Sequence, residues 1–320
     1  MAPSRILPVG EAPSVTSTRA SRRRPRSAAV APYLFLLPAA VLFIVFMIVP
    51  ICYAVLLSTR GTRIQGGAFG RRVEQFVGLE NYRGALSDPA LWAGLRRLLV
   101  YGGLVVPIML GLALLFALLL DVPRVRLARF SRVAIFLPYA VPGVIATLLW
   151  GFLYLPDVSP FHYVAALAGL PAPNFFGSRS IFGSVANIAI WGGVGFNMVV
   201  IYTSLRALPG ELFDAARVDG CSELMLALRI KVPLLVPSLV LTGVFSLIAT
   251  LQVFSEPMTL RPLSNALDSA WVPLMKVYRD AFVNDDQSSA AATSVMLAAV
   301  TLVLSLLLLR VLQKRAFGED

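Results

Sequence analysis

The chain has 320 residues, of which 58% are hydrophobic and only 14% charged, and its formal net charge is +11. This composition excludes an ordinary soluble globular protein and indicates an integral membrane protein. In a membrane protein an excess of arginine usually sets the topology, so the basic charge gives no support to nucleic-acid binding. The two cysteines, Cys52 and Cys221, lack the spacing of a metal site or a disulfide framework.

The first predicted elements are a basic tail and an apolar helix. Residues 1–31 form a tail rich in arginine, and residues 33–57 form a long apolar run. A helix rises about 1.5 Å per residue, so about 20 apolar residues cross the roughly 30 Å hydrocarbon layer of a bilayer. The run is longer than the apolar part of a signal peptide, and no small-x-small cleavage site follows Pro50. We therefore expect a cytoplasmic tail and an uncleaved membrane anchor.

Five further apolar runs follow along the chain. None of the runs contains Asp, Glu, Lys, Arg or His, and bilayer helices tolerate their internal Pro and Gly. We therefore predict an all-α membrane protein, a bundle of about six transmembrane helices within residues 32–320. The further runs are residues 98–120, 133–155, 181–205, 234–254 and 291–309.

The distribution of Lys and Arg predicts the orientation of this bundle. With the N-terminus inside, most of the basic residues fall on the cytoplasmic side, as the positive-inside rule requires. The outer loop of residues 58–97 is the exception, because it also holds many arginines, but long loops cross a membrane with less regard to charge. Both termini are therefore expected in the cytoplasm.

The loop of residues 208–233 joins the fourth and fifth predicted spans at the inner surface. Pro209 favours the start of a helix, and Gly220 is placed where a chain needs a left-handed turn after a helix. Leu224 and Leu228 then share one face of a second short helix. The loop therefore predicts a helix, a glycine turn and a helix that a partner could approach closely; a loop packed within the bundle is the alternative.

A spaced pattern within this loop resembles a known family. The loop holds Asp214-Ala215-Ala216, three residues, Gly220, nine residues and then Ile230-x-Val232-Pro233. This string is similar to the EAA loop of binding-protein-dependent ABC importer permeases, whose pattern is Glu-Ala-Ala, three residues, Gly, nine residues, Ile-x-Leu-Pro. This chain departs from the pattern by Asp for Glu and by Val for Leu, and both changes keep the charge or the apolar character. The matching positions are Asp214, Ala215, Ala216, Gly220, Ile230, Val232 and Pro233.

The resemblance implies roles for these residues. In that family the loop rests in a cleft of a cytoplasmic ATPase. Asp214 would meet a basic group of the ATPase, Ala215 and Ala216 would pack in the cleft, and Gly220 would set the turn, while Ile230 and Pro233 complete the coupling set.

Other segments are similar to the carbohydrate-uptake type of permease, as the first member of its pair. These segments include residues 137–142, residues 252–254 and residues 277–282. The resemblance implies a multi-pass protein in the cell membrane of a prokaryote. It also implies a heterodimer with a second permease, two copies of a cytoplasmic ATPase and an extracytoplasmic solute-binding protein.

The chain lacks the residues for ATP chemistry. A phosphate-binding loop needs Gly-Lys followed by Ser or Thr, and none of the three lysines, Lys231, Lys276 and Lys314, follows a glycine. We therefore expect no catalytic residue and no cofactor in this chain, with ATP and Mg used by the partner ATPase. The one histidine, His162, and the pair Asp285 and Asp286 do not suggest a metal site.

Polar and aromatic side chains within the spans are candidates for a solute path. A sugar needs hydrogen-bonding groups and flat aromatic faces, and burying an amide in lipid without a partner is costly. Aromatic belts at the membrane interface and helix packing are the alternative roles for such residues. The candidates are Asn197, Gln252, Tyr139, Trp191 and Ser246.

Two rival classes and one rival solute remain. An ion-coupled carrier would normally keep an ionisable group within its spans, and these spans have none. A membrane-embedded enzyme would need a cluster of His or acidic residues. Within the transporter class, the solute is expected to be a sugar or a sugar-like molecule, with a polyol or glycerol phosphate as the alternative; a phosphate would favour Arg near the path.

Overall fold

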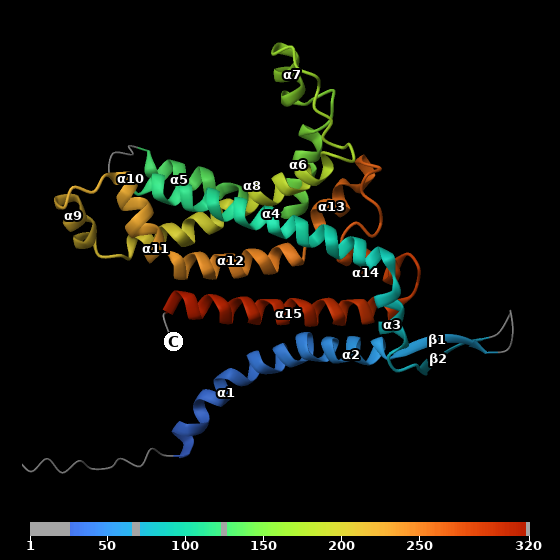
Figure 1. Cartoon of the computed structure of the whole chain (residues 1–320). Helices are drawn as coiled ribbons and strands as arrows, with labels where there is room; N and C mark the ends of the chain where they lie inside the picture. Colours follow the sequence, from blue (N-terminus) through green and yellow to red (C-terminus); the bar gives the residue numbers. More distant parts are fainter. Residues whose placement is uncertain (1–25, 66–70, 123–126, 318–320) are drawn as a thin grey trace, which may run out of the picture. The chain divides into compact units, whose positions relative to one another are not determined.

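The computed structural model describes residues 26–65, 71–122 and 127–317 (Figure 1). Its contacts divide the chain into two units, Met1–Cys52 and Tyr53–Asp320. The first unit holds helix α1 (Arg26–Phe43) and the π-helical turn η1 (Ile44–Ile48), and α2 (Val49–Ser58) continues into the second. The stretch Tyr33–Ser58 is helical and apolar enough to cross a membrane, as the first run predicts. Residues 1–25 of the predicted tail lie outside the described residues, and residues 26–31 belong to α1.

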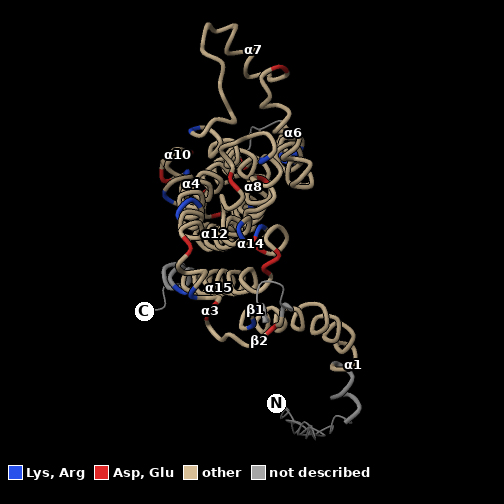
Figure 2. The backbone as a smooth tube through the Cα atoms, turned by 90° about the vertical axis from the view of Figure 1, so that its right-hand side faces the viewer, with Lys and Arg blue, Asp and Glu red and all other residues tan. Residues whose placement is uncertain are grey.

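Four long helices form the frame of the second unit. They are α4 (Pro89–Leu120), α8 (Ile181–Arg206), α12 (Val236–Leu251) and α15 (Gln287–Phe317). α4 packs against α8 and α12, and α12 packs against α15 (Figure 1). Each forms all or most of a candidate membrane span, and for α12 that span, Val236–Leu263, continues beyond the helix. Acidic and basic residues are sparse along the four helices (Figure 2). The described part of the chain is therefore mostly helical and holds five candidate spans, or six if the bent pair described below is one span.

The second span begins earlier than the hydropathy predicts. Asp88 caps α4 by accepting a hydrogen bond of 2.8 Å from the amide of Ala90, and Pro89 fits the first turn. Arg97 therefore lies inside the helix, and its guanidinium pairs with Asp268 at 3.3 Å. The predicted start at residue 98 was wrong because it marked the edge of the apolar run, whereas the helix extends beyond it.

The third predicted span, residues 133–155, is not one continuous helix. The structure has α5 (Ala128–Phe136), a 3₁₀ turn η2 (Leu137–Ala140) and α6 (Gly143–Leu153), and the two parts meet at a bend of 99°. Val141 is extended, with ψ of 126°, because the ring of Pro142 disfavours helical geometry in the residue before it. The third predicted run therefore forms two helical parts that bend at Val141–Pro142, and it is a sixth candidate span if the pair is taken as one.

The outer loop of residues 58–97 adds strands that an all-α prediction omits. Strands β1 (Arg60–Gln65) and β2 (Arg71–Phe76) pair antiparallel, with Arg60 opposite Phe76, and α3 (Glu80–Ser87) follows. Thr62, Ile64 and Val73 are β-branched residues, which favour strands. The fold is therefore mostly α with one small hairpin.

Shorter helices occupy the remaining connections. α7 (Pro160–Leu167) follows α6, and α13 (Ser255–Leu260), the turn η4 (Arg261–Leu263) and α14 (Pro273–Phe282) lie between α12 and α15. α14 packs against α15 and α4. α12 begins two residues after the start of the predicted fifth run and ends before the end of that run. α15 begins four residues before the start of the predicted sixth run.

Candidate functional site

The loop between α8 and α12 has the predicted helix-turn-helix form. α9 (Gly210–Val218) leads to a turn at Gly220, and α10 (Glu223–Leu226), the π-helical turn η3 (Ala227–Lys231) and α11 (Val232–Leu234) follow. Pro209 is the residue before the helix rather than its first residue. We call residues 208–233 the coupling loop.

Gly220 closes α9 through a Schellman motif. Its φ is +84°, its amide donates to the Arg217 carbonyl, and the Cys221 amide donates to the Ala216 carbonyl, both at 3.0 Å. No atom lies within 4 Å of where a Cβ would stand. The position therefore requires glycine for its backbone conformation and not for lack of space.

One face of the coupling loop packs on the chain's own core. Phe213, Ala216 and Leu226 are buried in the same cluster as Met198 and Leu205 of α8. Ala216 is therefore enclosed by its own chain, and of the two alanines only Ala215 is exposed. Of the two alanines expected to pack against a partner, Ala215 is therefore the one whose side chain is accessible to it.

The opposite face exposes apolar side chains and an acid. The side chain of Asp214 is 76% exposed and pairs with Arg217 at 2.8 Å, and Arg217 also binds Glu223 across the turn at 2.8 Å. Exposed apolar residues on a segment outside the candidate spans indicate a contact surface. The exposed apolar side chains are Leu212, Val218, Leu224, Met225 and Leu228. Pro233 is also exposed, and Ile230 is half-buried.

A buried ion pair fixes the base of the coupling loop. The Nζ of Lys231 lies 2.6 Å from Oδ2 of Asp121, at the end of α4, and 5.0 Å from the centre of the Phe213 ring. Arg206, at the end of α8, reaches the same aspartate at 3.5 Å. The sequence analysis did not identify this pair, although a lysine beside an apolar run is itself a signal that a carboxylate is near.

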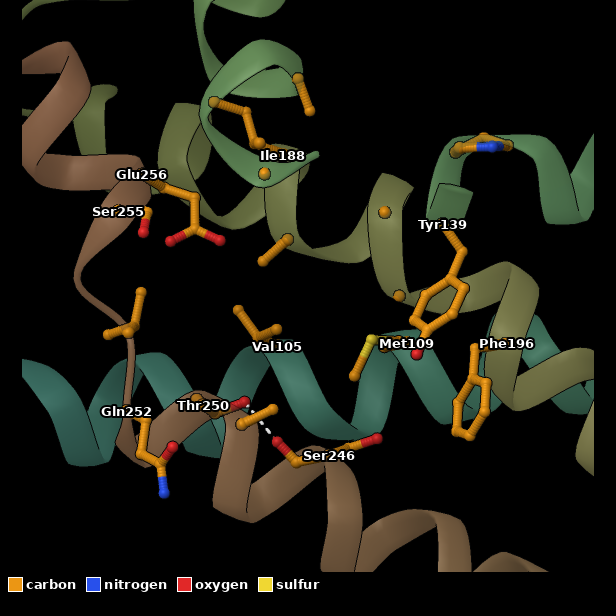
Figure 3. Close-up of a pocket in the computed structure, with 18 of the residues that line it drawn as sticks. Val105, Met109, Tyr139, Ile188, Phe196, Ser246, Thr250, Gln252, Ser255 and Glu256 are labelled. Carbon is orange, nitrogen blue, oxygen red and sulfur yellow. Dashed lines mark hydrogen bonds between the residues drawn. The ribbon is translucent and has the colours of Figure 1, made fainter. Parts of the chain in front are cut away.

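A cavity of about 660 Å³ lies between α4, α8, α12, the η2–α6 bend and the start of α13 (Figure 3). Four of the five predicted path residues line it: Tyr139, Asn197, Ser246 and Gln252. Trp191 does not, because it packs edge-on against Trp150 with ring centroids 5.7 Å apart. The structure therefore brings together all of the candidates except Trp191.

The lining of the cavity combines a polar pair of side chains with an aromatic pair. Asn197 is buried, donates to the Gly193 carbonyl at 3.0 Å and accepts from the Ser246 hydroxyl at 3.2 Å, so this pair links α8 to α12. Tyr139 stacks on Phe196 with ring centroids 5.0 Å apart, and both residues line the cavity (Figure 3). The cavity thus offers an aromatic surface beside hydrogen-bonding groups.

Glu256 is a lining residue that the sequence analysis missed. It lies in the first turn of α13 and its carboxylate faces the cavity (Figure 3). The predicted fifth span ended at residue 254, whereas the candidate span of the structure runs over Val236–Leu263. The predicted runs contain no ionisable residue, but the longer candidate spans of the structure do: Glu256 lies in this one, and Arg97 lies in Pro89–Leu120. Among the described residues, no three His, Cys, Asp or Glu side chains gather as a metal site requires.

Comparison with known proteins decides the family. The sequence pattern of the family described as "Binding-protein-dependent transport system inner membrane component" matches residues 109–317, which contain the coupling loop and the cavity wall formed by α8 and α12. The chain belongs to this family. It is therefore a multi-pass inner-membrane permease of a binding-protein-dependent ABC importer, and it is not itself the ATPase.

Named relatives and solved structures agree with this assignment. The permease is 30% identical to the sn-glycerol-3-phosphate transport system permease protein of Brucella abortus, over 89% of this chain and 96% of the relative. It is 27% identical to the diacetylchitobiose uptake system permease protein of Streptomyces coelicolor, over 87% and 81%. Its fold matches a chain of a bacterial alginate ABC transporter with a TM-score of 0.79 at 19% identity, over 92% and 97%.

Proposed function

We propose that this permease imports a sugar or sugar-like solute, delivered by an extracytoplasmic binding protein, along a path that it shares with a second permease subunit. Two copies of a cytoplasmic ATPase drive the import at the coupling loop, and ATP and Mg are used there and not by this chain. Both termini of the permease lie in the cytoplasm, on the side of the ATPases.

The observation that carries the proposal is the two-sided coupling loop. One face is part of the permease core, through Phe213 and Ala216, and the other exposes apolar side chains around Asp214. A force applied to the exposed face reaches α4 and α8 directly, because Lys231 joins the loop to Asp121. The exposed face is therefore the docking surface for the ATPase, with Asp214 and Ala215 in contact and Ala216 and Ile230 holding the loop to its own bundle.

The cavity is the part of the solute path that this chain supplies. The stacked pair of Tyr139 and Phe196 offers a flat surface for the apolar face of a sugar ring, and Gln252 and Ser246 offer hydrogen bonds. A second permease closes the open side. A polyol or glycerol phosphate is the second candidate solute, because the Brucella relative is named for glycerol 3-phosphate.

A pair of glycines tests the docking role. Gly220 and Gly169 both have positive φ, +84° and +67°, and both leave open space for a side chain. Valine at either position strains the backbone similarly, but only Gly220 lies in the coupling loop. In the whole complex we expect Gly220→Val to reduce co-purification of the ATPase and solute uptake by roughly tenfold or more, as the loss of about 1.4 kcal/mol of coupling or more would give.

Gly169→Val is the matched control, since Gly169 lies in the loop after α7. It should leave co-purification of the ATPase unchanged. If the Gly220→Val complex keeps its ATPase and its uptake, the coupling loop is not the docking surface.

A further inference from the structure

The cavity of the permease has one unusual lining residue, Glu256. Of the described residues that line the cavity, it is the one with a charged side chain; the others are apolar, aromatic or uncharged polar groups. Its carboxylate faces the open space bounded by Val105 and Ile188, on the opposite side from Ser246 and Gln252 (Figure 3). The structure therefore places a carboxyl group where a solute would pass.

The apolar surroundings increase the effect of this charge. Val105 and Ile188 lie on either side of the space that the carboxylate faces, and a charge beside low-dielectric walls acts over a longer distance than one in bulk water. At a separation of roughly 8 Å, a single charge changes the local concentration of a monovalent ion by roughly five- to thirtyfold. An ionised Glu256 would deplete anions from the cavity by this factor and enrich cations.

A carboxylate also recognises uncharged hydroxyl groups. It only accepts hydrogen bonds, and bonds from a hydroxyl to an ionised acceptor are among the stronger ones. A phosphate or carboxylate solute would need Arg, Lys or several amide donors instead. The described lining residues contain neither Lys nor Arg, and of their two side-chain amides that of Asn197 already donates to the Gly193 carbonyl, which leaves Gln252. The chemistry of this wall suits a solute with many hydroxyls and no negative charge.

We infer that Glu256 determines the charge selectivity of this permease: the cavity takes an uncharged polyhydroxylated solute, whose hydroxyls donate to the carboxylate, and excludes phosphorylated or carboxylated ones. The inference rests on the proposed function, because it assumes that the solute passes through this cavity. The inferred solute differs from glycerol 3-phosphate, for which the Brucella relative is named.

A thiol probe measures the charge selectivity without knowledge of the solute. Ala249 lines the cavity and is exposed, so Ala249→Cys, in a chain whose Cys52 and Cys221 are changed to Ala, places one thiol there. The whole complex, held in lipid nanodiscs that leave both faces accessible, is treated with a cationic reagent, trimethylammonium-ethyl methanethiosulfonate, or an anionic one, sulfonatoethyl methanethiosulfonate. The rate of modification by the cationic reagent is divided by the rate for the anionic one. This ratio is then divided by the same ratio for a small free thiol, which removes the difference in intrinsic reactivity between the reagents, because the thiolate is the reacting form in each case.

With Glu256 present, we expect this normalised cation-to-anion ratio to be roughly five or more. Glu256→Gln should bring it close to one, and Glu256→Asp, which keeps the charge, should restore it. Glu74→Gln on β2 removes an acid outside the cavity and should leave the ratio unchanged. A ratio near one in the parent overturns the inference even if the Glu256→Gln complex fails to assemble, and so does a high ratio that survives Glu256→Gln.

An uptake assay separates this inference from the proposed function. Proteoliposomes that contain the complete importer and its binding protein are given radiolabelled sn-glycerol 3-phosphate, and no uptake above empty liposomes is expected. Uptake of this anion, with the ATPase still bound, overturns the inference about Glu256 and leaves the docking role of the coupling loop intact. Loss of the docking role is seen separately, in the co-purification of the Gly220→Val complex.

Discussion

The two ends of α4 carry the same residue type in opposite electrical surroundings. Asp88 precedes the first turn, where it accepts a hydrogen bond from Ala90, and helix N-termini favour negative charge. Asp121 follows the last turn, where the helix dipole opposes a negative charge. The first aspartate is therefore stabilised by its own helix, whereas the second depends on cations from other segments.

The lysine partners of these aspartates also differ. Lys276 lies between two carboxylates, Asp88 at 3.1 Å and Asp280 at 2.5 Å. Lys231 lies beside Asp121 at 2.6 Å, and it has no second carboxylate within ion-pair distance in the described part of the chain. Asp280 lies on α14 itself, four residues from Lys276, so the ammonium of Lys276 stays paired even without Asp88. Among the described residues, the ammonium of Lys231 depends on Asp121 alone.

The largest effect is expected at the inner end. Asp121→Asn leaves the buried ammonium of Lys231 without a carboxylate, and breaking a buried pair in this way costs about 3–5 kcal/mol of unfolding free energy. Asp88→Asn should cost only about 1 kcal/mol, because Asn is as good an N-cap as Asp and Lys276 keeps Asp280. Equilibrium unfolding of the purified permease in mixed micelles measures both. Equal losses of unfolding free energy in Asp121→Asn and Asp88→Asn would contradict this difference between the two ends of α4.

A second variant sharpens the explanation for the inner end. Asp121→Leu combined with Lys231→Met removes both charges, and replacing a buried pair by apolar groups is often neutral or stabilising. We expect the double variant to recover more than half of the loss caused by Asp121→Leu alone. Arg206 is the control, because its side chain is 65% exposed, and Arg206→Met should give no recovery. A double-mutant cycle on unfolding free energies gives the interaction directly; a value near zero would contradict a buried pair.

Local patterns in the sequence were sufficient for the coupling loop. Pro209 and Gly220 act through their own backbone preferences, and the spacing of the motif lies within 26 residues, so the helix-turn-helix form could be predicted. The burial of Ala216 could not, because it depends on contacts with α8. Pro142 did carry a readable signal for the bend in the third span, which the hydropathy of residues 133–155 obscured.

The cavity depends on which side of each helix a residue occupies. Asn197 and Phe196 of α8 line it, while Trp191 lies five to six residues away and faces Trp150. Successive residues of a helix turn by about 100°, so composition alone does not place a side chain on one face. Glu256 was missed for a different reason: hydropathy ended the fifth span before a carboxylate that tertiary contacts bring to the cavity.

The smallest effect is expected in the pH dependence of the outer end. Burial raises the pKa of Asp88, but the Ala90 amide and Lys276 lower it by more, so the pKa lies below its usual value of 3.8. A carboxyl with a lowered pKa in the folded state stabilises the fold above its unfolded pKa, and this contribution disappears as the pH falls through the folded value. The difference in unfolding free energy between the wild type and Asp88→Asn should therefore stay constant from about pH 7 to 5 and decrease below about pH 4. Unfolding of both proteins across this range tests it, with Asp157→Asn on an exposed loop as the control. A difference that grows on acidification would mean that Asp88 is stabilised in its protonated form and that Asp280 alone holds Lys276.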